Sequence, residues 1–238
     1  MKMVKKWTNE EENKLRENYP ILGYKVIDLF PGRTKSSVLR KADWLDLKVL
    51  RKRRKELRED RIGYLDIEAS QLKADFGIVY SWVIKKQGEN KYLSSIIKRE
   101  EILNGTLDKR VCQELVKALK EFTLIYSFYG TFFDIPFLRT RCLMNKVEFI
   151  PRGEIEHRDV YFLARRCLRL HSNRLESVCD ALDIKGKTRL EGRYWILANS
   201  GNVEALKYIF EHNIADTQIL EKVHEVLAQF EYPQRKYM

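Results

Sequence analysis

Two carboxylates with a spacing suited to metal binding lie in the short apolar segment RIGYLDIEA, which begins at Arg61. The segment is rich in residues that favour β-strands, and in a strand residues two positions apart point to the same face. Asp66 and Glu68 would therefore project together, while Ile67 would point into the core. Because adjacent carboxylates repel each other and lose hydration, the pair favours a bound divalent cation. Surface strands also contain this spacing, so the motif alone leaves that alternative open.

A second acidic position follows another apolar run. The segment FTLIYSF is expected to form a buried strand over residues 122–127, and Asp134 lies where that strand gives way to a helix. A carboxylate at such a position can reach the C-terminal edge of a sheet, where the first pair also emerges. Capping of the following helix is the alternative role for Asp134.

The third acidic position lies in the C-terminal part of the chain, which is expected to be mainly helical. A spacing of four residues places His212 and Asp216 one turn apart on the same helix face. Asp216 could complete a metal site, and His212 could lie over an attacking water. An ordinary exposed His–Asp pair has the same spacing, so only the three positions together favour a metal centre.

The order of these motifs resembles that of the DEDD superfamily of 3′–5′ exonucleases. The segment YGTFFDIPFL, residues 129–138, is similar to the second motif of the exonuclease domains of family B DNA polymerases. The similarity continues through residues 157–159, residues 174–177 and Lys187. It covers essentially residues 62–230 and implies an α/β fold with a ribonuclease H-like mixed sheet flanked by helices.

This resemblance implies hydrolysis of a phosphodiester bond with two divalent cations, one activating a water and the other stabilising the departing 3′-oxygen. The implied ligands are oxygen atoms, which suit Mg²⁺ or Mn²⁺. Asp66 would bridge the two ions, Glu68 and Asp216 would hold the nucleophile side, and Asp134 would support the other side. His212 would orient the water or act as the general base.

Two positions depart from the family pattern. The family usually has Asn at the position of Tyr129, where it helps to hold the substrate, so Tyr129 is expected to contact nucleic acid with an altered preference. His212 stands four residues before Asp216, which is the position of the family's alternative Tyr. The expected function is 3′–5′ exonuclease action on DNA. The alternatives are a structure- or site-specific endonuclease with the same metal site and a non-catalytic DNA-binding protein with a degenerate nuclease fold.

The positive charge of the chain is concentrated at its N-terminal end. Residues 1–61 contain 18 Lys and Arg against 10 Asp and Glu, which accounts for +8 of the net charge of +11. A basic segment attached to a nearly balanced remainder suggests a module that binds a polyanion. We expect the partner to be nucleic acid, DNA rather than RNA, and not a membrane.

Residues 7–47 are expected to form three short helices. Thr8 and Glu11 have the spacing of a capping box, Pro20 is expected to stop the first helix, and Thr34 is expected to begin the third. The pattern W-T-x-E-E followed by P-G-R-T resembles Myb/SANT-like helix-turn-helix modules. In that family the third helix enters the major groove of DNA, although such modules also bind proteins.

The residues expected to contact nucleic acid are at the start and on the basic face of this third helix. Free backbone amides and the positive end of the helix dipole favour phosphate there. The predicted contact residues are Arg33, Thr34, Lys35, Ser37, Arg40 and Lys41.

The chain is therefore expected to contain a helix-turn-helix domain over residues 1–47, a basic linker helix over residues 48–61 and an exonuclease domain over residues 62–238. The linker could equally be a solvated helix. Within the third segment, Asp159 is expected to cap a helix over residues 160–168. The N-terminus lacks the apolar core of a secretory signal, and no apolar run approaches the ~20 residues of a membrane span. An intracellular location, cytoplasmic or nucleoid-associated, is expected.

Overall fold

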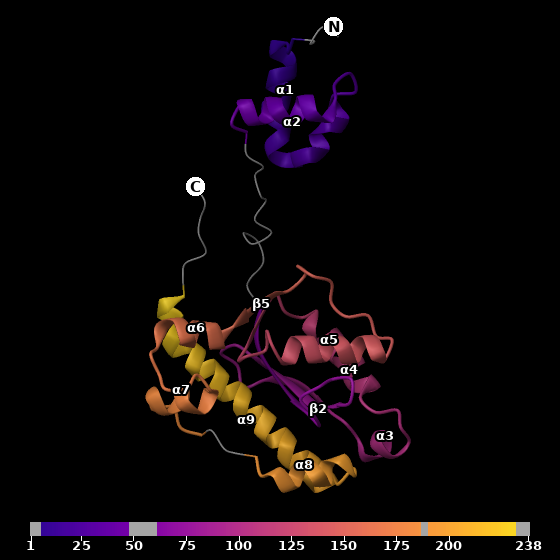
Figure 1. Ribbon diagram of the computed structural model, residues 1–238, viewed down its shortest axis with the longest axis vertical. Coiled ribbons are helices and arrows are strands. Elements are labelled where there is room, and N and C mark those ends of the chain that lie inside the picture. Colours follow the sequence, from indigo (N-terminus) through magenta and orange to yellow (C-terminus); the bar gives the residue numbers. More distant parts are fainter. Residues whose placement is uncertain (1–5, 48–60, 187–189, 232–238) are drawn as a thin grey trace. The chain divides into compact units, whose positions relative to one another are not determined.

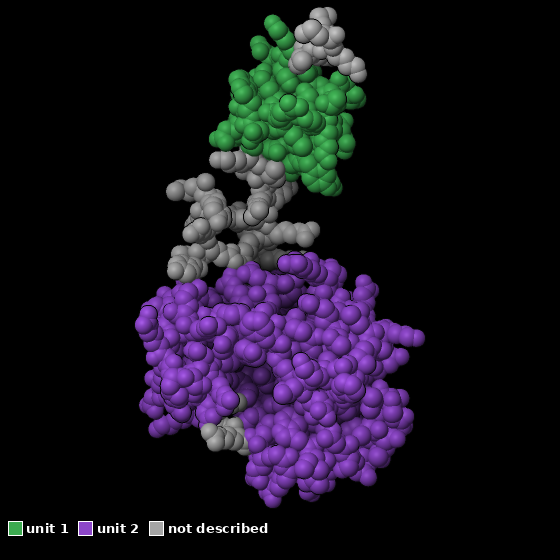
Figure 2. Space-filling model, viewed as in Figure 1, with its two compact units in different colours: residues 1–59 green, residues 60–238 purple. Residues whose placement is uncertain are grey.

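The computed structural model describes residues 6–47, 61–186 and 190–231. The chain divides into two compact units, residues 1–59 and 60–238, which Figure 2 shows in different colours. The expected linker helix falls almost entirely on residues 48–60, outside the described residues. Among the described residues, none of the helices combines the length and the apolar character that a membrane-spanning helix requires.

The first unit is a small helical bundle around a compact apolar core. Its elements are α1 (Asn9–Leu22), the 3-10 helix η1 (Gly23–Leu29) and α2 (Lys35–Trp44). The Thr8–Glu11 capping box is confirmed, and Thr34 caps α2 as expected. The buried core residues are Leu15, Val26, Phe30, Val38 and Ala42.

Two details of this unit differ from expectation. The second helix is a 3-10 helix, which fits a segment with Gly23 at its start and β-branched residues within it, all weak α-helix formers. Pro20 does not stop α1, which continues to Leu22. Pro20 removes one N–H from the helix and crowds the carbonyl of Arg16, which disfavours the last turn without ending it, and α1 terminates at Gly23, with φ of 56°.

The second unit contains a five-stranded mixed sheet in the order β3-β2-β1-β4-β5. The strands are β1 (Ile62–Ala69), β2 (Val79–Lys86), β3 (Tyr92–Ile96), β4 (Leu124–Ser127) and β5 (Glu156–Asp159). The first three pair in antiparallel fashion, whereas β4 is parallel to both β1 and β5. The mixed α/β sheet predicted from the order of strands and helices is confirmed.

Helices cover both faces of this sheet (Figure 1). They are α3 (Arg99–Leu103), α4 (Lys109–Leu119), α5 (Asp134–Met144), α6 (Val160–Cys167), α7 (Leu175–Ala181), α8 (Gly192–Asn199), α9 (Val203–Leu227) and the 3-10 helix η2 (Ala228–Phe230). Because strand residues alternate between faces, Leu65 and Ile125 pack towards α4 and α5, while Tyr64 and Tyr126 pack towards α6, α7 and the second half of α9. The second half of α9 therefore faces the same side of β1 as Tyr64, whereas buried residues of its first half belong to the cluster of Leu65.

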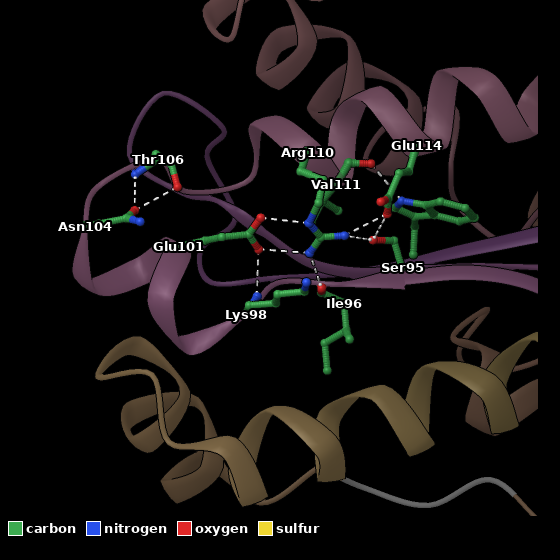
Figure 3. Close-up of polar contacts among 10 residues, drawn as sticks. Ser95, Ile96, Lys98, Glu101, Asn104, Thr106, Arg110, Val111 and Glu114 are labelled. Carbon is green, nitrogen blue, oxygen red and sulfur yellow. Dashed lines mark hydrogen bonds and ion pairs between the residues drawn. The ribbon is translucent and has the colours of Figure 1, made fainter.

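Two polar networks hold the helices to the strands. Arg110 of α4 donates to both carboxylate oxygens of Glu101 in α3, at 2.7 and 2.9 Å, and to the carbonyl of Ile96 in β3 at 2.7 Å (Figure 3). A second network centres on the fully buried Asp108, which accepts from Val79 N at 2.8 Å and from Arg141 Nε at 2.9 Å. Asp108 thus joins β2 to α5, the helix that begins at the candidate ligand Asp134.

Candidate metal centre

Asp66 and Glu68 lie on β1 beyond the last residue that pairs with β4, which is Tyr64. Both side chains are partly exposed, whereas Ile67 between them is only 4% exposed. The predicted alternation along the strand is confirmed. Since Asp66 and Glu68 are in phase with Tyr64, they face the side of the sheet on which α9 packs.

Helix α9 brings its own polar side chains to these carboxylates. It runs diagonally across the sheet in Figure 1 and contacts both β1 and β2. One ligand atom each from Glu68, His212 and Asp216 lie within 4.8 Å of one another. His212 Nε2 is 3.5 Å from Asp216 Oδ2, as expected for residues one turn apart on one helix face. Residues almost 150 positions apart in the chain thus form a single cluster.

Asp66 is connected to the same helix through Asn213. The Nδ2 group of Asn213 donates to Asp66 Oδ2 at 2.5 Å, and the hydroxyl of Ser81 on β2 donates to Asn213 Oδ1 at 3.1 Å. Asn213 and Ser81 are both 0% exposed. Sequence analysis did not identify either residue. The one available signal was the spacing of Asn213, which stands four residues after Ile209 and three before Asp216, on the buried face of α9.

Asp134 is the first residue of α5, so its contact with β1 comes from α5 and not from α9. Its Oδ1 accepts the backbone N–H of Ile67 at 3.2 Å, at a point where β4 has already ended and offers β1 no partner. The N-cap position of α5 is Phe133, so Asp134 is not the helix cap. Burial, together with the nearby charge of Asp159, raises the pKa of Asp134 to about 7.

The loop before α5 is held by Asp159, which also caps α6 as predicted. Asp159 accepts the backbone N–H groups of Tyr129 at 2.7 Å, Thr131 at 2.8 Å and Tyr161 at 3.0 Å. Tyr129 adopts a φ of 65°, and the residue is 46% exposed. A Cβ atom on Gly130 would lie 2.1 Å from Ser127 Oγ and 3.1 Å from Asp134 Oδ2, so the loop can pass here only with glycine.

The residues present fit a divalent cation. The cluster offers carboxylate oxygens from Glu68 and Asp216 and an imidazole nitrogen from His212. Asp66 belongs to the segment of β1 formed by residues 66–68. Asp134 contacts the same segment, because it accepts the backbone N–H of Ile67. Carboxylate oxygens are the donors that Mg²⁺ and Mn²⁺ prefer. A carboxyl group as buried as Asp134 is costly to ionise without a nearby positive charge, and a bound cation would supply that charge.

The predicted nucleic-acid contacts of the first unit divide into two groups. Arg33 and Lys41 make ion pairs with α1: Arg33 contacts Glu11 at 2.6 Å, and Lys41 contacts Glu12 at 2.6 Å. The Arg33 side chain is 4% exposed, and its guanidinium also lies 4.1 Å from the centre of the Trp7 ring. These two basic residues hold α2 to α1, which sequence analysis did not anticipate.

The remaining predicted contacts lie at the start and along the outer face of α2. Thr34 Oγ1 accepts the N–H of Ser37 at 3.2 Å, so both residues take part in the helix cap. Lys35 and Arg40 are exposed, and Arg40 also donates to Ser36 Oγ at 2.9 Å. Lys35 and Arg40 are therefore the exposed basic side chains of the predicted set.

Comparison with known proteins places this arrangement in context. A sequence model described as the RNase_H superfamily matches residues 63–228. A DNA polymerase of Methanocaldococcus jannaschii is 29% identical over 90 residues, which cover 30% of this chain and 6% of that polymerase. The structure of the family B DNA polymerase from the archaeon Pyrobaculum calidifontis matches with a TM-score of 0.58 and 17% identity, over 73% of this chain and 25% of that one. The chain thus corresponds to a minor part of either polymerase, and at 17% identity the structural match concerns the fold.

Proposed function

The chain belongs to the RNase H superfamily, and from this premise we propose that residues 60–238 form a divalent-metal-dependent 3′–5′ exonuclease that acts on DNA. The observation that carries the proposal is the convergence of Glu68, His212 and Asp216 within 4.8 Å, at the strand that also bears Asp66. The contact of Asp134 with the amide of Ile67 adds the fourth acidic residue to this segment.

The proposed ligands are Asp66, Glu68, Asp134 and Asp216, which would hold two Mg²⁺ or Mn²⁺ ions. Bound there, the ions would supply an activated water and stabilise the departing 3′-oxygen. His212 lies against Asp216, where its imidazole can orient the attacking water and accept its proton. Burial of Asp134 and of Asn213 beside the cluster excludes bulk water from the inner side of the site.

Exposed apolar side chains in the chain segments that adjoin Glu68 and Asp134 favour a single-stranded substrate. Tyr129 and Phe132, in the loop that precedes Asp134, are 46% and 58% exposed, and their ring centres are 5.2 Å apart. Leu72 and Phe76, in the segment that follows Glu68, are each 82% exposed. Unpaired bases can stack on or pack against such side chains with little dependence on sequence.

In this proposal the first unit is a helix-turn-helix module that binds double-stranded DNA near the single strand on which the nuclease acts. The exposed Lys35 and Arg40 of α2 would contact phosphates. Arg33 and Lys41 would support this surface by keeping α2 on α1.

A cleavage panel of 5′-end-labelled and circular strands, in DNA and RNA forms, tests the proposed activity. With Mn²⁺ we expect stepwise shortening of linear DNA from its 3′ end and no cleavage of circular single-stranded DNA, which lacks an end. Cleavage of the circle would indicate an endonuclease, and preference for the RNA strand would overturn the DNA assignment.

Substitution of one proposed ligand tests the site itself. Asp66→Ala should lower the cleavage rate by ~10³-fold or more, because loss of a metal-bound carboxylate removes several kcal/mol of transition-state stabilisation. The matched control is Asp180→Ala, which removes an exposed carboxylate of α7 and should leave the rate unchanged. An active Asp66→Ala protein would show that the site assignment is wrong.

A further inference from the structure

Asn213 is a buried polar residue in the middle of α9, and its hydrogen bonds connect three separate elements. It is 0% exposed, it donates to Asp66 on β1, and it accepts from Ser81 on β2. Ser81 lies opposite Glu68 in the antiparallel pair of strands, so its side chain is on the same face as both carboxylates. The amide therefore occupies the space between α9 and the part of the sheet that forms the candidate metal centre.

The chemistry of these groups allows one orientation of the amide. An ionised carboxylate only accepts hydrogen bonds, so Asn213 must present its NH₂ group to Asp66. The carbonyl oxygen then faces Ser81, whose hydroxyl can donate to it. Hydroxyl, amide and carboxylate thus form one directed chain from Ser81 through Asn213 to Asp66, and such chains strengthen their members.

A purely structural role would be served better by an apolar residue. Asn has a lower helix propensity than Leu or Ala, and burial of an amide is unfavourable unless the amide is hydrogen-bonded. The side-chain bonds of Asn213 go to Asp66 and Ser81 and not to the backbone of its own helix. The polar character of this position is therefore directed at Asp66.

We propose that Asn213 is a positioning residue that fixes the Asp66 carboxylate in the orientation needed to bind a divalent cation, with Ser81 fixing Asn213 in turn. The inference rests on the proposed function, because it treats Asp66 as a metal ligand. Residues that hydrogen-bond a ligating carboxylate restrict its rotation and tune its basicity, and their loss typically weakens metal binding by about 10- to 100-fold.

The test measures binding of Mn²⁺ alone, by titration calorimetry on the full-length, metal-free protein. Asn213→Ala should weaken Mn²⁺ binding by about 10- to 100-fold. The matched control is Thr217→Val. Thr217 is also 0% exposed on α9, but its hydroxyl donates at 2.8 Å to the carbonyl of Ile214 in its own helix. Thr217→Val should lower thermal stability without changing the affinity for Mn²⁺.

Ser81→Ala separates positioning from a general packing effect. It removes one hydroxyl that touches Asp66 only through Asn213, so it should weaken Mn²⁺ binding by less than Asn213→Ala does. The double variant should bind Mn²⁺ no more weakly than Asn213→Ala alone, because Ser81 has no target once the amide is absent. Unchanged affinity in Asn213→Ala, or additive losses in the double variant, overturns the proposal. If circular dichroism shows that Asn213→Ala does not fold, an unchanged affinity in Ser81→Ala overturns it.

Asp66→Asn distinguishes failure of this inference from failure of the proposed function. If Asp66→Asn binds Mn²⁺ and cleaves DNA like the wild type, the metal site itself is wrongly assigned. If Asp66→Asn loses both properties while Asn213→Ala retains its affinity, the metal site stands and only the positioning role fails.

Discussion

The carboxylate of Asp134 accepts the backbone N–H of Ile67 at 3.2 Å, between the two carboxylates of β1. The bond replaces a strand partner that β4 no longer provides and joins the start of α5 to the centre of the sheet. Asp134 therefore has a structural role as an acceptor and, in our proposal, a chemical role as an anion. The two roles can be separated by substitution.

Asp134→Asn should retain stability and lose activity. The side-chain amide keeps an oxygen that can accept from Ile67, but it carries no negative charge for a cation. Because burial disfavours the ionised carboxyl, the Asp134→Asn protein should unfold at the same temperature as the wild type or higher in a metal-free buffer.

Asp134→Ala, which leaves the N–H of Ile67 without this acceptor, should lower the free energy of unfolding by about 1–3 kcal/mol. Thermal unfolding and cleavage rates check both; normal cleavage by Asp134→Asn would exclude Asp134 as a ligand.

Gly130→Ala should disrupt the loop that positions Asp134. The added Cβ would come within 2.1 Å of Ser127 Oγ, so the loop or β4 has to move, and Asp134 Oδ2 lies only 3.1 Å from the same point. We expect a lower unfolding temperature and slower cleavage. Gly192→Ala is the control, because Gly192 begins α8 with open space around its Cβ position. Equal behaviour of the two variants would contradict the steric argument.

Sequence analysis predicted pairs of residues from local geometry, and it predicted from the family resemblance that Asp134 and Asp216 join Asp66 and Glu68. The two-residue period of a strand placed Asp66 and Glu68 on one face, and the four-residue spacing in a helix placed His212 beside Asp216. Asn213 lies 147 positions from Asp66 in sequence, so periodicity carries no information about their contact.

The same limit explains the basic residues of the first unit. The sequence predicts Arg33 and Lys41 as phosphate contacts, because Arg33 lies just before α2 and Lys41 lies on the basic face of that helix. Their partners are carboxylates 22 or more positions earlier in the chain, and only the packing of α2 on α1 brings them together. Pro20 is a different case, because a proline disfavours a helix without always ending it, and α1 continues for two residues beyond Pro20.

Lys35 and Arg40 should contribute to DNA binding through charge alone. Lys35→Ala and Arg40→Ala should each weaken binding and reduce the slope of log Kd against log salt concentration by about 0.9 for each phosphate that the removed side chain would neutralise. Fluorescence anisotropy with a labelled duplex at several salt concentrations measures both quantities. Lys25→Ala removes the same charge from an exposed position on η1 and should have a smaller effect. An equal effect would show that net charge, and not the α2 surface, determines binding.

His224 should make the second unit less stable in acid. Its Nδ1 lies 2.8 Å from the hydroxyl of Tyr64, and its ring centre lies 3.8 Å from that of Tyr126. Burial lowers the pKa of His224 below its usual value of 6.5, although the carboxylates facing it oppose this shift. The titratable and charged groups that face it are Tyr64 on β1, Tyr126 on β4, Arg158 on β5, Glu221 on α9 and Glu231 after η2.

A histidine with a lowered pKa binds its proton more tightly in the unfolded chain than in the folded one. Its contribution to stability is therefore complete above pH 6.5 and is lost as the pH falls from 6.5 through the pKa of the folded state. Burial lowers the pKa of His157 as well, so His157 contributes with the same sign. Asp134, whose pKa is raised to about 7, has the opposite effect over the same pH range, because its folded form binds a proton more tightly than the unfolded chain does. The contribution of His224 is therefore measured by comparison of variants, with urea unfolding at pH of about 7.5 and about 5. Between these two conditions His224→Gln, which cannot be protonated, should lose less stability or gain more than the wild type does, whereas His171→Gln at an exposed position should behave like the wild type. If His224→Gln responds to pH like the wild type, the acid sensitivity assigned to His224 is wrong.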